Sequence, residues 1–299
     1  MKILITGASG FVGRHLVKHC IGLGHQVTAV DLAPFPESVD PDHLKVVQAD
    51  TTRPGSWQDV VSDCDALINL AGVNIFHRWS AHYKELIYDS RILTTRHLVN
   101  ALPQKTSVAF CSTSAVGYYG SRGDTLLEED APAGDDFLAR VCVDWEKEAM
   151  QAQSKGARVV IPRFGVVLGR NGGALAKMIP AYRLFVGGPL GNGRQWFAWI
   201  HIQDLIEAML FVIGKNDMEG PVNFCSPGQV QNNEFSRTLA ARLNRPAALR
   251  VPGFMLRLAA GELGSLVLNS QRAVPQKLEQ AGYMFQYPSL ESALAQAVD

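Results

Sequence analysis

Three regularly spaced glycines near the start of the chain are the residues whose types and spacing most suggest chemistry. Gly7, Gly10 and Gly13 follow a short apolar run at residues 3–5, and an amphipathic segment at residues 11–23 begins directly after Gly10. A glycine-rich turn between a buried strand and a helix lets the backbone approach a pyrophosphate, which the helix N-terminus attracts. Structural turns use the same spacing, so the flanking strand and helix carry the argument. The predicted dinucleotide contacts are Gly7, Ser9, Gly10, Phe11, Val12 and Gly13.

An acidic residue after the next strand-like segment indicates the form of the cofactor. Residues 26–30 make up that segment, and Asp31 follows it. A carboxylate about twenty residues beyond the glycines accepts hydrogen bonds from the adenosine ribose hydroxyls and repels a 2′-phosphate. NAD is therefore favoured, with NADP as the alternative, because Arg14 in the first helical turn would reverse the preference. An ordinary loop role is the other interpretation of Asp31.

Polar or small residues also end the following predicted strands. Asp50 follows the segment at residues 44–49, where an aspartate can bond the adenine amino group. Small residues follow the segment at residues 66–70 and let the chain pass close to a cofactor. Ligands of parallel sheets bind at the carboxyl ends of strands. The further predicted cofactor contacts are Asp50, Thr51, Leu70, Ala71, Gly72 and Ser112.

Strand and helix patterns alternate to about residue 165. Further helices are predicted over residues 56–61, 83–102 and 137–154, and further strands over residues 107–111 and 158–161. Such alternation implies parallel strands joined by right-handed helical crossovers. The predicted fold is therefore α/β, with a doubly wound parallel (Rossmann) sheet.

The chain changes character beyond residue 165. Glycine-rich loops are expected at residues 169–173 and 187–191, and later helices at residues 203–213, 233–243 and 253–268. We therefore predict a dinucleotide-binding domain over residues 1–165. A smaller C-terminal substrate lobe over residues 166–299 is expected to be interleaved with it.

Composition and charge exclude several classes of partner. The 299 residues include 28 basic and 28 acidic side chains, so the basic excess needed to bind nucleic acid or an anionic membrane is missing. No apolar run approaches the roughly 18 residues that span a bilayer. Eight histidines lack metal-ligand spacing, so no metal is predicted. The five cysteines have no paired spacing, as expected of reduced thiols in a cytoplasmic protein.

Several motifs together resemble the extended short-chain dehydrogenase/reductases, which include sugar-nucleotide epimerases and dehydratases. The matching motifs lie at residues 6–13, 69–72, 112–114, 119–120, 163–169 and 199–204. Further blocks at residues 69–75, 117–120, 134–137, 187–191, 193–196 and 270–272 are similar to the atypical branch called the epimerase family. A C-terminal segment at about residues 247–294 is peculiar to that branch. The resemblance implies a bound dinucleotide and hydride transfer at a carbon that bears oxygen.

The resemblance also shows where the usual catalytic pair is missing. The superfamily's Tyr-x-x-x-Lys pair falls at Leu138 and Cys142, and neither side chain ionises as that pair does. Ser114 resembles the superfamily's hydrogen-bonding hydroxyl, with an ordinary strand-end serine as the alternative. Tyr118 and Tyr119 are the acid/base candidates, although a phenol needs a nearby cation to lower its pKa from about 10. Packing is the alternative role of both tyrosines.

Arginines near aromatic residues indicate an anionic substrate. Arg78 precedes Trp79, and Arg194 lies close to Trp196. A guanidinium beside an aromatic face suits a phosphate or carboxylate joined to a flat group, such as a nucleotide-linked sugar. Packing between lobe and sheet is the alternative. The predicted substrate contacts are Arg78, Trp79, Asp136, Arg194, Trp196 and His201, of which Asp136 also reads as a helix N-cap and His201 as a loop anchor.

Two further arginines complete the cofactor set that the resemblance implies. Arg91 lies within the predicted helix at residues 83–102 and is expected to face the cofactor or Asp136. Arg163 begins one of the matching motifs.

Two hypotheses for the function follow. The first is an NAD(P)-dependent oxidoreductase or epimerase that acts on a small anionic substrate, for which a nucleotide sugar is one candidate. The second is a cofactor-binding sensor or assembly module without turnover, which the missing tyrosine and lysine would explain. A homodimer built on the helix at residues 83–102 is compatible with either.

Overall fold

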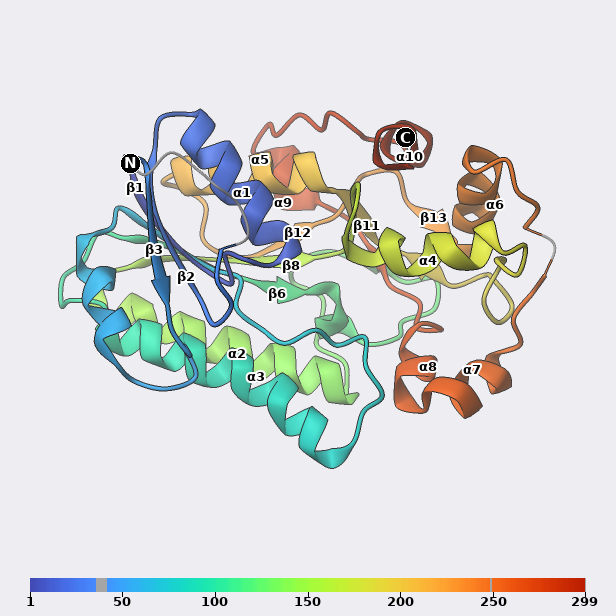
Figure 1. Ribbon diagram of the computed structural model, residues 1–299, viewed down its shortest axis with the longest axis horizontal. Coiled ribbons are helices and arrows are strands. Elements are labelled where there is room, and N and C mark those ends of the chain that lie inside the picture. The colour runs from blue at the N-terminus through green and yellow to red at the C-terminus, as the bar shows by residue number, and fades with distance from the viewer. Residues whose placement is uncertain (36–41, 248, 299) are drawn as a thin grey trace.

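A parallel sheet of eight strands lies at the centre of the part of the chain that this computed structural model describes, residues 1–35, 42–247 and 249–298 (Figure 1). Its strands are β1 (Lys2–Thr6), β2 (Gln26–Asp31), β3 (Leu44–Gln48), β4 (Ala66–Asn69), β5 (Ala109–Ser112), β6 (Ser114–Ala115), β8 (Arg158–Phe164) and β12 (Gly220–Phe224). Their order is β12-β8-β5-β4-β1-β2-β3, with β6 beside β8, and every pair is parallel. The predicted doubly wound parallel sheet is confirmed.

The strand order reverses at β1. This strand pairs with β2 on one side and with β4 on the other, so the two halves of the sheet diverge from it. Thr6 ends β1 opposite Asn69, the last residue of β4. In open α/β sheets a reversal of this kind leaves a crevice at the carboxyl ends of the strands, where ligands bind.

Helices cover both faces of this sheet (Figure 1). One face carries α1 (Phe11–Gly22) and α5 (Ile202–Gly214), and the other carries α2 (Ala81–Ala101) and α3 (Phe137–Met150). Successive side chains of a strand point to opposite faces. Ile3 and Ile5 therefore pack in the α1 and α5 layer, whereas Leu4 packs in the α2 and α3 layer. Short 3-10 helices η1 (Ser56–Asp63), η2 (Val116–Tyr119) and η3 (Gln151–Lys155) join these elements.

A smaller region lies beside the sheet and has its own core around Trp199, Phe235 and Leu294. Its helices are α4 (Gly173–Arg183), α6 (Asn232–Arg242), α7 (Gly253–Ala260), α8 (Glu262–Leu266) and α10 (Leu290–Val298). The helix α9 (Gln276–Gln280) packs against β12 and belongs to the main core. The short strands are β7 (Leu126–Leu127), β9 (Val166–Leu168), β10 (Trp196–Phe197), β11 (Trp199–His201), β13 (Val230–Gln231) and β14 (Arg272–Ala273). Although α5 and β12 follow residue 165, they belong to the layers of the main sheet.

Two elements of this region differ from the sequence-based prediction. We did not predict α4, because it begins at a glycine and contains Pro180, which weakens a helical pattern. The helix predicted over residues 253–268 is divided into α7 and α8 at Gly261, whose φ of +60° does not continue a helix. Residues 248 and 299 of the predicted lobe lie outside the described residues.

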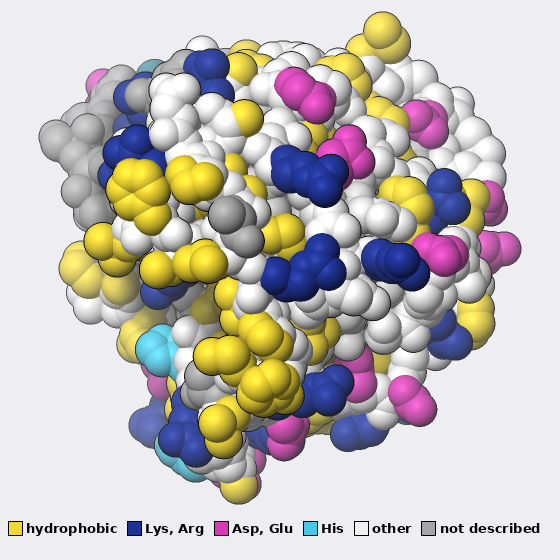
Figure 2. Space-filling view, turned by 90° about the vertical axis from the view of Figure 1, so that its right-hand side faces the viewer, with side chains coloured by type: hydrophobic (Ala, Val, Ile, Leu, Met, Phe, Trp, Pro, Cys, Tyr) yellow, Lys and Arg dark blue, Asp and Glu magenta, His cyan; other side chains and the backbone are white. Residues whose placement is uncertain are grey.

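The side of the molecule that carries the end of α4 and the helix α7 exposes many hydrophobic side chains (Figure 2). Leu184, Phe185 and Val186 follow α4, and Phe254 and Leu258 lie on α7. Each of these five side chains is more than half exposed, and Leu258 reaches 83%. None of the helices within the described ranges has the length and hydropathy that crossing a bilayer requires.

Candidate cofactor and active site

Two glycines of the first turn are packed so tightly that no side chain fits. A Cβ on Gly7 would lie 2.7 Å from the carbonyl carbon of Leu70, and one on Gly13 would lie 2.3 Å from the carbonyl oxygen of Gly7. Gly7 also has a φ of +69°, which favours glycine. The turn therefore brings the start of α1 against the ends of β1 and β4, as a close approach to a pyrophosphate requires.

The N-terminus of α1 has no side-chain cap. Gly10 occupies the cap position, and the first turn holds no acidic residue. Within the described ranges, the backbone N–H groups of Phe11 and Val12 have no acceptor. By contrast, Ser80 caps α2 and Asp136 caps α3 with side-chain oxygens. Unpaired N–H groups and a positive dipole end suit a pyrophosphate, so the residues present fit the predicted dinucleotide.

A second glycine-rich loop encloses the ring of Phe11. A Cβ on Gly172 would lie 2.1 Å from that ring, and one on Gly173 would lie 2.9 Å from it. Nη2 of Arg14 donates to the carbonyl oxygen of Asn171 at 3.4 Å. The loop at residues 169–173 thus packs on the start of α1. If Phe11 contacts a cofactor as predicted, the contact is made by its backbone N–H, because its ring is packed against the loop.

Asp31, at the end of β2, is hydrogen-bonded to the backbone of the glycine turn. Its Oδ2 accepts a hydrogen bond from the backbone N–H of Ser9 at 2.8 Å, and its Oδ1 accepts one from the N–H of Ala33 at 3.2 Å. The Ser9 hydroxyl donates to the carbonyl oxygen of Ala33. Each carboxylate oxygen keeps further acceptor capacity for a ribose hydroxyl. The charge of Asp31 lies next to the turn, where the sequence analysis expects it.

The polar side chains after β3 bond mainly to their own surroundings. Oδ1 of Asp50 accepts hydrogen bonds from the N–H and the hydroxyl of Thr52, at 3.0 and 2.6 Å. Oδ2 of Asp50 lies 3.5 Å from Nε of Arg53. The buried hydroxyl of Thr51 bonds to that of Thr94 at 2.8 Å and so joins the end of β3 to α2. Because its hydroxyl is bonded to Thr94, Thr51 would make its predicted cofactor contact through its backbone.

A buried amide joins the carboxyl ends of β1, β4 and β5. Oδ1 of Asn69 accepts a hydrogen bond from Thr6 at 2.7 Å, and its Nδ2 donates to Thr95 at 2.9 Å and to Ser112 at 3.3 Å. Beside Ser112, the hydroxyl of Thr113 is buried and has no partner among the described residues. Because an unpaired buried hydroxyl costs about 1–3 kcal/mol, Thr113 is a candidate ligand contact. Thr113 lies within the motif at residues 112–114 but is not among the predicted site residues.

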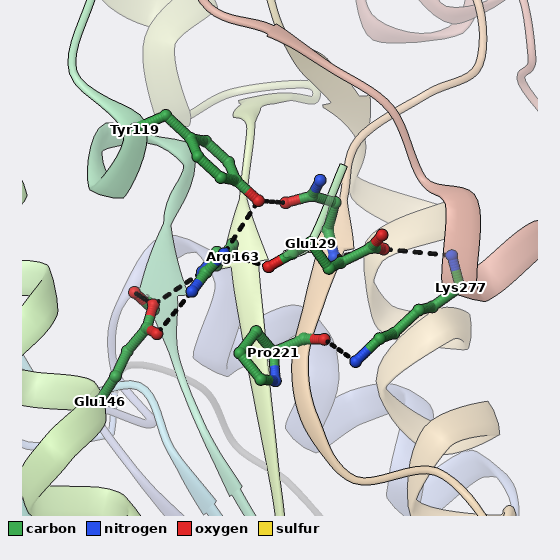
Figure 3. A network of polar contacts seen from close by, with 8 residues as sticks. Tyr119, Glu129, Glu146, Arg163, Pro221 and Lys277 are labelled. Atoms are coloured by element: carbon green, nitrogen blue, oxygen red, sulfur yellow. Dashed lines mark hydrogen bonds and ion pairs between the residues drawn. The ribbon is translucent and has the colours of Figure 1, made fainter. Parts of the chain in front are cut away.

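Glu146 and Arg163 form a buried ion pair beside Ser114 (Figure 3). The carboxylate accepts hydrogen bonds from Nε and Nη2 of Arg163, each at 2.8 Å. Burial alone lowers the pKa of the guanidinium, but the hydrogen bonds and charge of Glu146 outweigh it and raise that pKa. Ser114 donates its only hydroxyl proton to Glu146 at 2.7 Å. In this arrangement Ser114 accepts hydrogen bonds but does not donate one to a substrate oxygen.

The predicted cofactor contact of Arg163 is corrected by its position. Its Nη1 donates to the hydroxyl of Tyr119 at 3.0 Å and to the carbonyl oxygen of Glu129 at 2.9 Å (Figure 3). All three nitrogen atoms are therefore bonded internally, and the residue is only 2% exposed. Arg163 holds the groups around it in place instead of contacting a ligand.

The two candidate acid/base tyrosines have different surroundings. Tyr119 is 0% exposed, and its hydroxyl donates to Oδ1 of Asn223 at 2.7 Å. Burial, partly offset by Arg163, raises the pKa of Tyr119 to about 12. The prediction that Tyr119 is an acid or base is therefore wrong. Tyr118 is partly buried, its ring centroid lies 3.5 Å from the guanidinium carbon of Arg163, and its hydroxyl bonds to no described residue.

Arg91 reaches from α2 to the loop that follows β4. A Cβ on Gly72 would lie 3.0 Å from the guanidinium carbon of Arg91. Nη2 of Arg91 donates to the carbonyl oxygen of Val73 at 3.2 Å, and the guanidinium lies 5.3 Å from the ring centroid of Trp145. Arg91 therefore adjoins the predicted cofactor loop and makes no contact with Asp136.

One group of predicted substrate residues surrounds the start of α3. Trp79 packs edge-on against Phe137, with ring centroids 5.4 Å apart. Asp136 caps α3 through Oδ1 and accepts a hydrogen bond from Asn269 at Oδ2, at 3.2 Å, so its position is that of a structural cap. Arg78 is exposed and pairs with no acid in the described part of the chain.

The second group, Arg194 and Trp196, contacts the segment of chain that begins at Asn269. The indole of Trp196 donates to Asp124 at 2.7 Å, and the guanidinium of Arg272 covers one of its faces at 4.3 Å. The backbone N–H of Trp196 donates to Ser270, which follows Asn269. Arg194 is exposed, and its guanidinium has no partner among the described residues. The segment at residues 269–272 therefore connects the two predicted substrate groups.

Comparison with known proteins agrees with this geometry. The family model described as NAD dependent epimerase/dehydratase family matches residues 3–225. The chain belongs to this family. A second model, described as a domain of unknown function (DUF1731), matches residues 251–297, and so the expected C-terminal segment of the epimerase family branch is confirmed.

Similar proteins of the epimerase/dehydratase family come from distant organisms. An Arabidopsis thaliana protein, the epimerase family protein SDR39U1 homolog, chloroplastic, is 37% identical over 98% of this chain and 86% of its own length. An epimerase family protein of Staphylococcus haemolyticus is 39% identical over 100% of this chain and 99% of its own. The crystal structure of human epimerase family protein SDR39U1 with NADPH is 32% identical, has a TM-score of 0.86 and covers 99% of this chain and 98% of that one.

In this epimerase/dehydratase family member, His201 is a core residue, which corrects its predicted contact with substrate. It is 0% exposed, and its ring lies 4.0 Å from that of Tyr287. Nδ1 accepts from the N–H of Gln203 at 3.3 Å, so Nε2 carries the proton that is donated to Gln296 at 2.8 Å. Burial lowers the pKa of His201 and keeps the imidazole neutral. His201 joins α5 to α10.

The helix α3 offers no ionised pair at the positions where the superfamily has tyrosine and lysine. Cys142 is buried, and burial raises the pKa of its thiol to about 11, so the thiol is neutral. The Cβ of Leu138 lies 3.8 Å from the position of a Cβ on Gly117, in η2. These two positions of α3 therefore supply neither the acid nor the cation of the superfamily's usual pair.

A cavity of about 500 Å³ lies away from all of these residues. Lys2, Gln26, Lys45 and Asp63 are among the residues that line it, and they lie at the amino ends of β1, β2 and β3 and at the end of η1. Ligands of parallel sheets bind at the opposite edge. The cavity therefore does not belong to the candidate site.

Proposed function

We propose that this chain is an NAD(P)-dependent oxidoreductase or epimerase that acts on a small anionic substrate. The observation that carries the proposal is the uncapped N-terminus of α1 behind Gly7 and Gly13, at the point where the strand order reverses. When bound, the nicotinamide supplies hydride exchange with a carbon that bears oxygen. The residues of the chain must then bind the dinucleotide, orient the substrate and move one hydroxyl proton.

Tyr118 is the residue that we propose as the acid/base group. Its hydroxyl bonds to none of the described residues, and the guanidinium of Arg163 lies against its ring at 3.5 Å. Glu146 fixes that guanidinium through two hydrogen bonds. The proton of Ser114 is held by Glu146, so Ser114 has no proton to exchange with the substrate. In this arrangement the proton passes between the substrate hydroxyl and Tyr118.

We propose that the substrate is negatively charged and that it is a nucleotide-linked sugar. Arg78 and Arg194 are exposed arginines without acidic partners among the described residues, and each lies close in sequence to a tryptophan. A guanidinium fork binds phosphate or carboxylate through two parallel hydrogen bonds. The two groups meet at the segment of residues 269–272, so a phosphate between them would be reached from both sides.

NAD is the proposed cofactor, although a similar human protein was crystallised with NADPH. Asp31 ends β2 beside the glycine turn, and both of its oxygens already accept backbone hydrogen bonds that hold the carboxylate in place. A fixed negative charge at this position repels a 2′-phosphate. A tighter affinity for NADP than for NAD in a direct titration would contradict this part of the proposal.

Turnover by the full chain tests the enzyme proposal. The protein is incubated with NAD and a panel of nucleotide-linked sugars, and reduced-cofactor absorbance or epimer formation is followed. We expect Tyr118→Phe to lower turnover at least about 100-fold, as loss of a general acid/base does, without weakening cofactor binding. Tyr88→Phe is the matched control, because the Tyr88 hydroxyl bonds to Asp144 on the surface between α2 and α3. Full activity of Tyr118→Phe would contradict the assignment.

A sensor or assembly module is the second candidate function. Two observations favour it. The thiol of Cys142 is neutral, and the Ser114 hydroxyl donates its proton to Glu146. This protein would bind a dinucleotide and turn over nothing. Tight binding combined with no turnover of any anionic alcohol, ketone or nucleotide sugar would favour the sensor over the enzyme.

We also propose a homodimer and a cytoplasmic location. The outer side of α2 carries the exposed Leu86 between charged residues, and a second copy could pack there. The five cysteines are all free, as in a reducing compartment. Light scattering that gives the mass of one chain would contradict the dimer, and cell fractionation that finds the protein outside the cytoplasm would contradict the location.

A further inference from the structure

Two arginines lie close to the carboxyl ends of β4, β5 and β8, but only one is neutralised. Arg163 forms a bidentate ion pair with Glu146 inside the protein. Arg91 pairs with no acidic side chain in the described part of the chain, and its bonds go to the carbonyl oxygens of Ile87 and Val73, at 3.0 and 3.2 Å. A guanidinium has five N–H donors, so three remain for a ligand. A partly buried charge without a counter-charge attracts electron-rich groups.

A continuous line of contacts joins Arg91 to the glycine turn. A Cβ on Gly7 would lie 2.7 Å from the carbonyl oxygen of Leu70 and 2.8 Å from the nitrogen of Ala71. Gly72 follows, and a Cβ there would lie 3.0 Å from the guanidinium carbon of Arg91 and 3.2 Å from each of its terminal nitrogens. The segment at residues 70–72 therefore lies between the glycine turn and Arg91. Arg91 is on the side of β1 that carries β4 and β5.

The helix α3 supplies no cation at this place. Cys142 is buried, and burial raises the pKa of its thiol to about 11, so the thiol is neutral. Burial also lowers the pKa of Arg91, but an arginine stays protonated at neutral pH. Arg91 is thus the fixed positive charge beside Gly72.

We propose that Arg91 binds the nicotinamide-bearing half of the dinucleotide and that its unneutralised charge makes the site bind the reduced cofactor more tightly than the oxidised one. This inference rests on the proposed cofactor binding. A dinucleotide whose pyrophosphate lies at α1 extends its second half toward β4 and β5. The nicotinamide ring is positively charged when oxidised and neutral when reduced, so a fixed cation nearby disfavours the oxidised form.

The test compares dissociation constants of the full chain for NADH and NAD, measured by calorimetry. Arg91→Met and Arg91→Gln remove the charge, whereas Arg91→Lys keeps it. Arg96→Met is the matched control, because Arg96 lies on the same helix but is exposed and paired with Glu148. Because the repulsion between the guanidinium and the oxidised ring is removed, we expect the ratio of the NAD constant to the NADH constant to fall about threefold or more in the two neutral variants. It should stay near the wild-type value in Arg91→Lys and Arg96→Met.

The outcomes separate this inference from the proposed function. A wild-type ratio that persists in a folded neutral variant would overturn the role of Arg91 while leaving cofactor binding intact. A wild type that binds neither dinucleotide would overturn the proposed function and the inference together. Circular dichroism of each variant identifies any that does not fold, and two neutral variants are used because Met and Gln pack differently.

Discussion

Glu146 is the residue on which the chemistry-bearing side chains converge. Its carboxylate binds Arg163 and Ser114, and Arg163 in turn lies against the ring of Tyr118. The carboxylate is nearly enclosed, with a side-chain exposure of 9%. Removal of one partner from a buried ion pair leaves the other charge without compensation, which is strongly destabilising. Glu146 therefore positions the proposed acid/base group through the guanidinium.

The neighbouring Glu148 offers a direct comparison. It pairs with Arg96 at 2.9 Å, but that arginine is 48% exposed. We predict that Glu146→Gln lowers the free energy of unfolding by about 3–5 kcal/mol, whereas Glu148→Gln changes it by less than about 1 kcal/mol. Urea denaturation of both variants measures the difference. Equal effects at the two positions would show that the buried pair does not stabilise the site as described.

Local motifs were predictable at the residue scale, and burial was not. Asp31 and the glycines lie within one unit of consecutive elements, β1-α1-β2, so their spacing in the sequence fixes their geometry. The environment of Tyr119 depends on Asn223, which is 104 positions away, and that of His201 depends on Gln296, which is 95 positions away. No local pattern reports such partners, and both residues were therefore assigned to the site in error.

Elements that meet at the glycine turn are held by close backbone contact. The third glycine, Gly13, lies on the buried side of α1 against the carbonyl oxygen of Gly7 and the backbone of Ala8. Gly22 ends the same helix, and a Cβ there would meet nothing within 4 Å. The two glycines therefore lie on the same helix, but only Gly13 is tightly packed.

We predict opposite results for the two alanine variants. Gly13→Ala should lower the free energy of unfolding by about 1–3 kcal/mol through overpacking and abolish dinucleotide binding, because the turn must move. Gly22→Ala should leave binding unchanged and change stability by no more than about 1 kcal/mol, in the stabilising direction. Urea denaturation and calorimetric titration measure both properties. Unaltered dinucleotide affinity in Gly13→Ala would refute the close-approach argument.

Regular elements were predictable where strand and helix patterns alternate. The boundaries of α1 and β2 agree with the predicted segments within one residue at each end. The helix α4 was missed because its start is a glycine and its last turn follows Pro180. The break between α7 and α8 was missed because Gly261 adopts a positive φ that the apolar pattern does not reveal.

At the scale of the whole molecule, the C-terminal segment is part of the main core. Tyr283 is 8% exposed, belongs to the cluster around α1 and α5, and donates its hydroxyl proton to the carbonyl oxygen of Asp204 at 2.8 Å. The carboxylate of Asp204 accepts hydrogen bonds from the backbone N–H groups of Gln286 and Tyr287. The part of the second family model's region from α9 to Tyr287 is thus built into the main core.

We therefore expect one cooperative unfolding transition for the whole chain. Tyr283→Ala should lower the free energy of unfolding by about 3–5 kcal/mol, as loss of a buried aromatic side chain does. The adjacent Met284 is 84% exposed, and Met284→Ala should change it by less than about 0.5 kcal/mol. Urea denaturation followed by tryptophan fluorescence and by circular dichroism gives the answer. Two separate transitions would mean that the C-terminal segment folds independently.

The central claim is that the N-terminus of α1 and the glycine turn bind a pyridine dinucleotide. Calorimetric titration of the folded full chain with NAD, NADH, NADP and NADPH tests it most directly. The account predicts saturable binding of the NAD pair, tighter than that of the NADP pair because of Asp31, and loss of binding in Gly13→Ala. Absence of any binding heat with all four dinucleotides would contradict it.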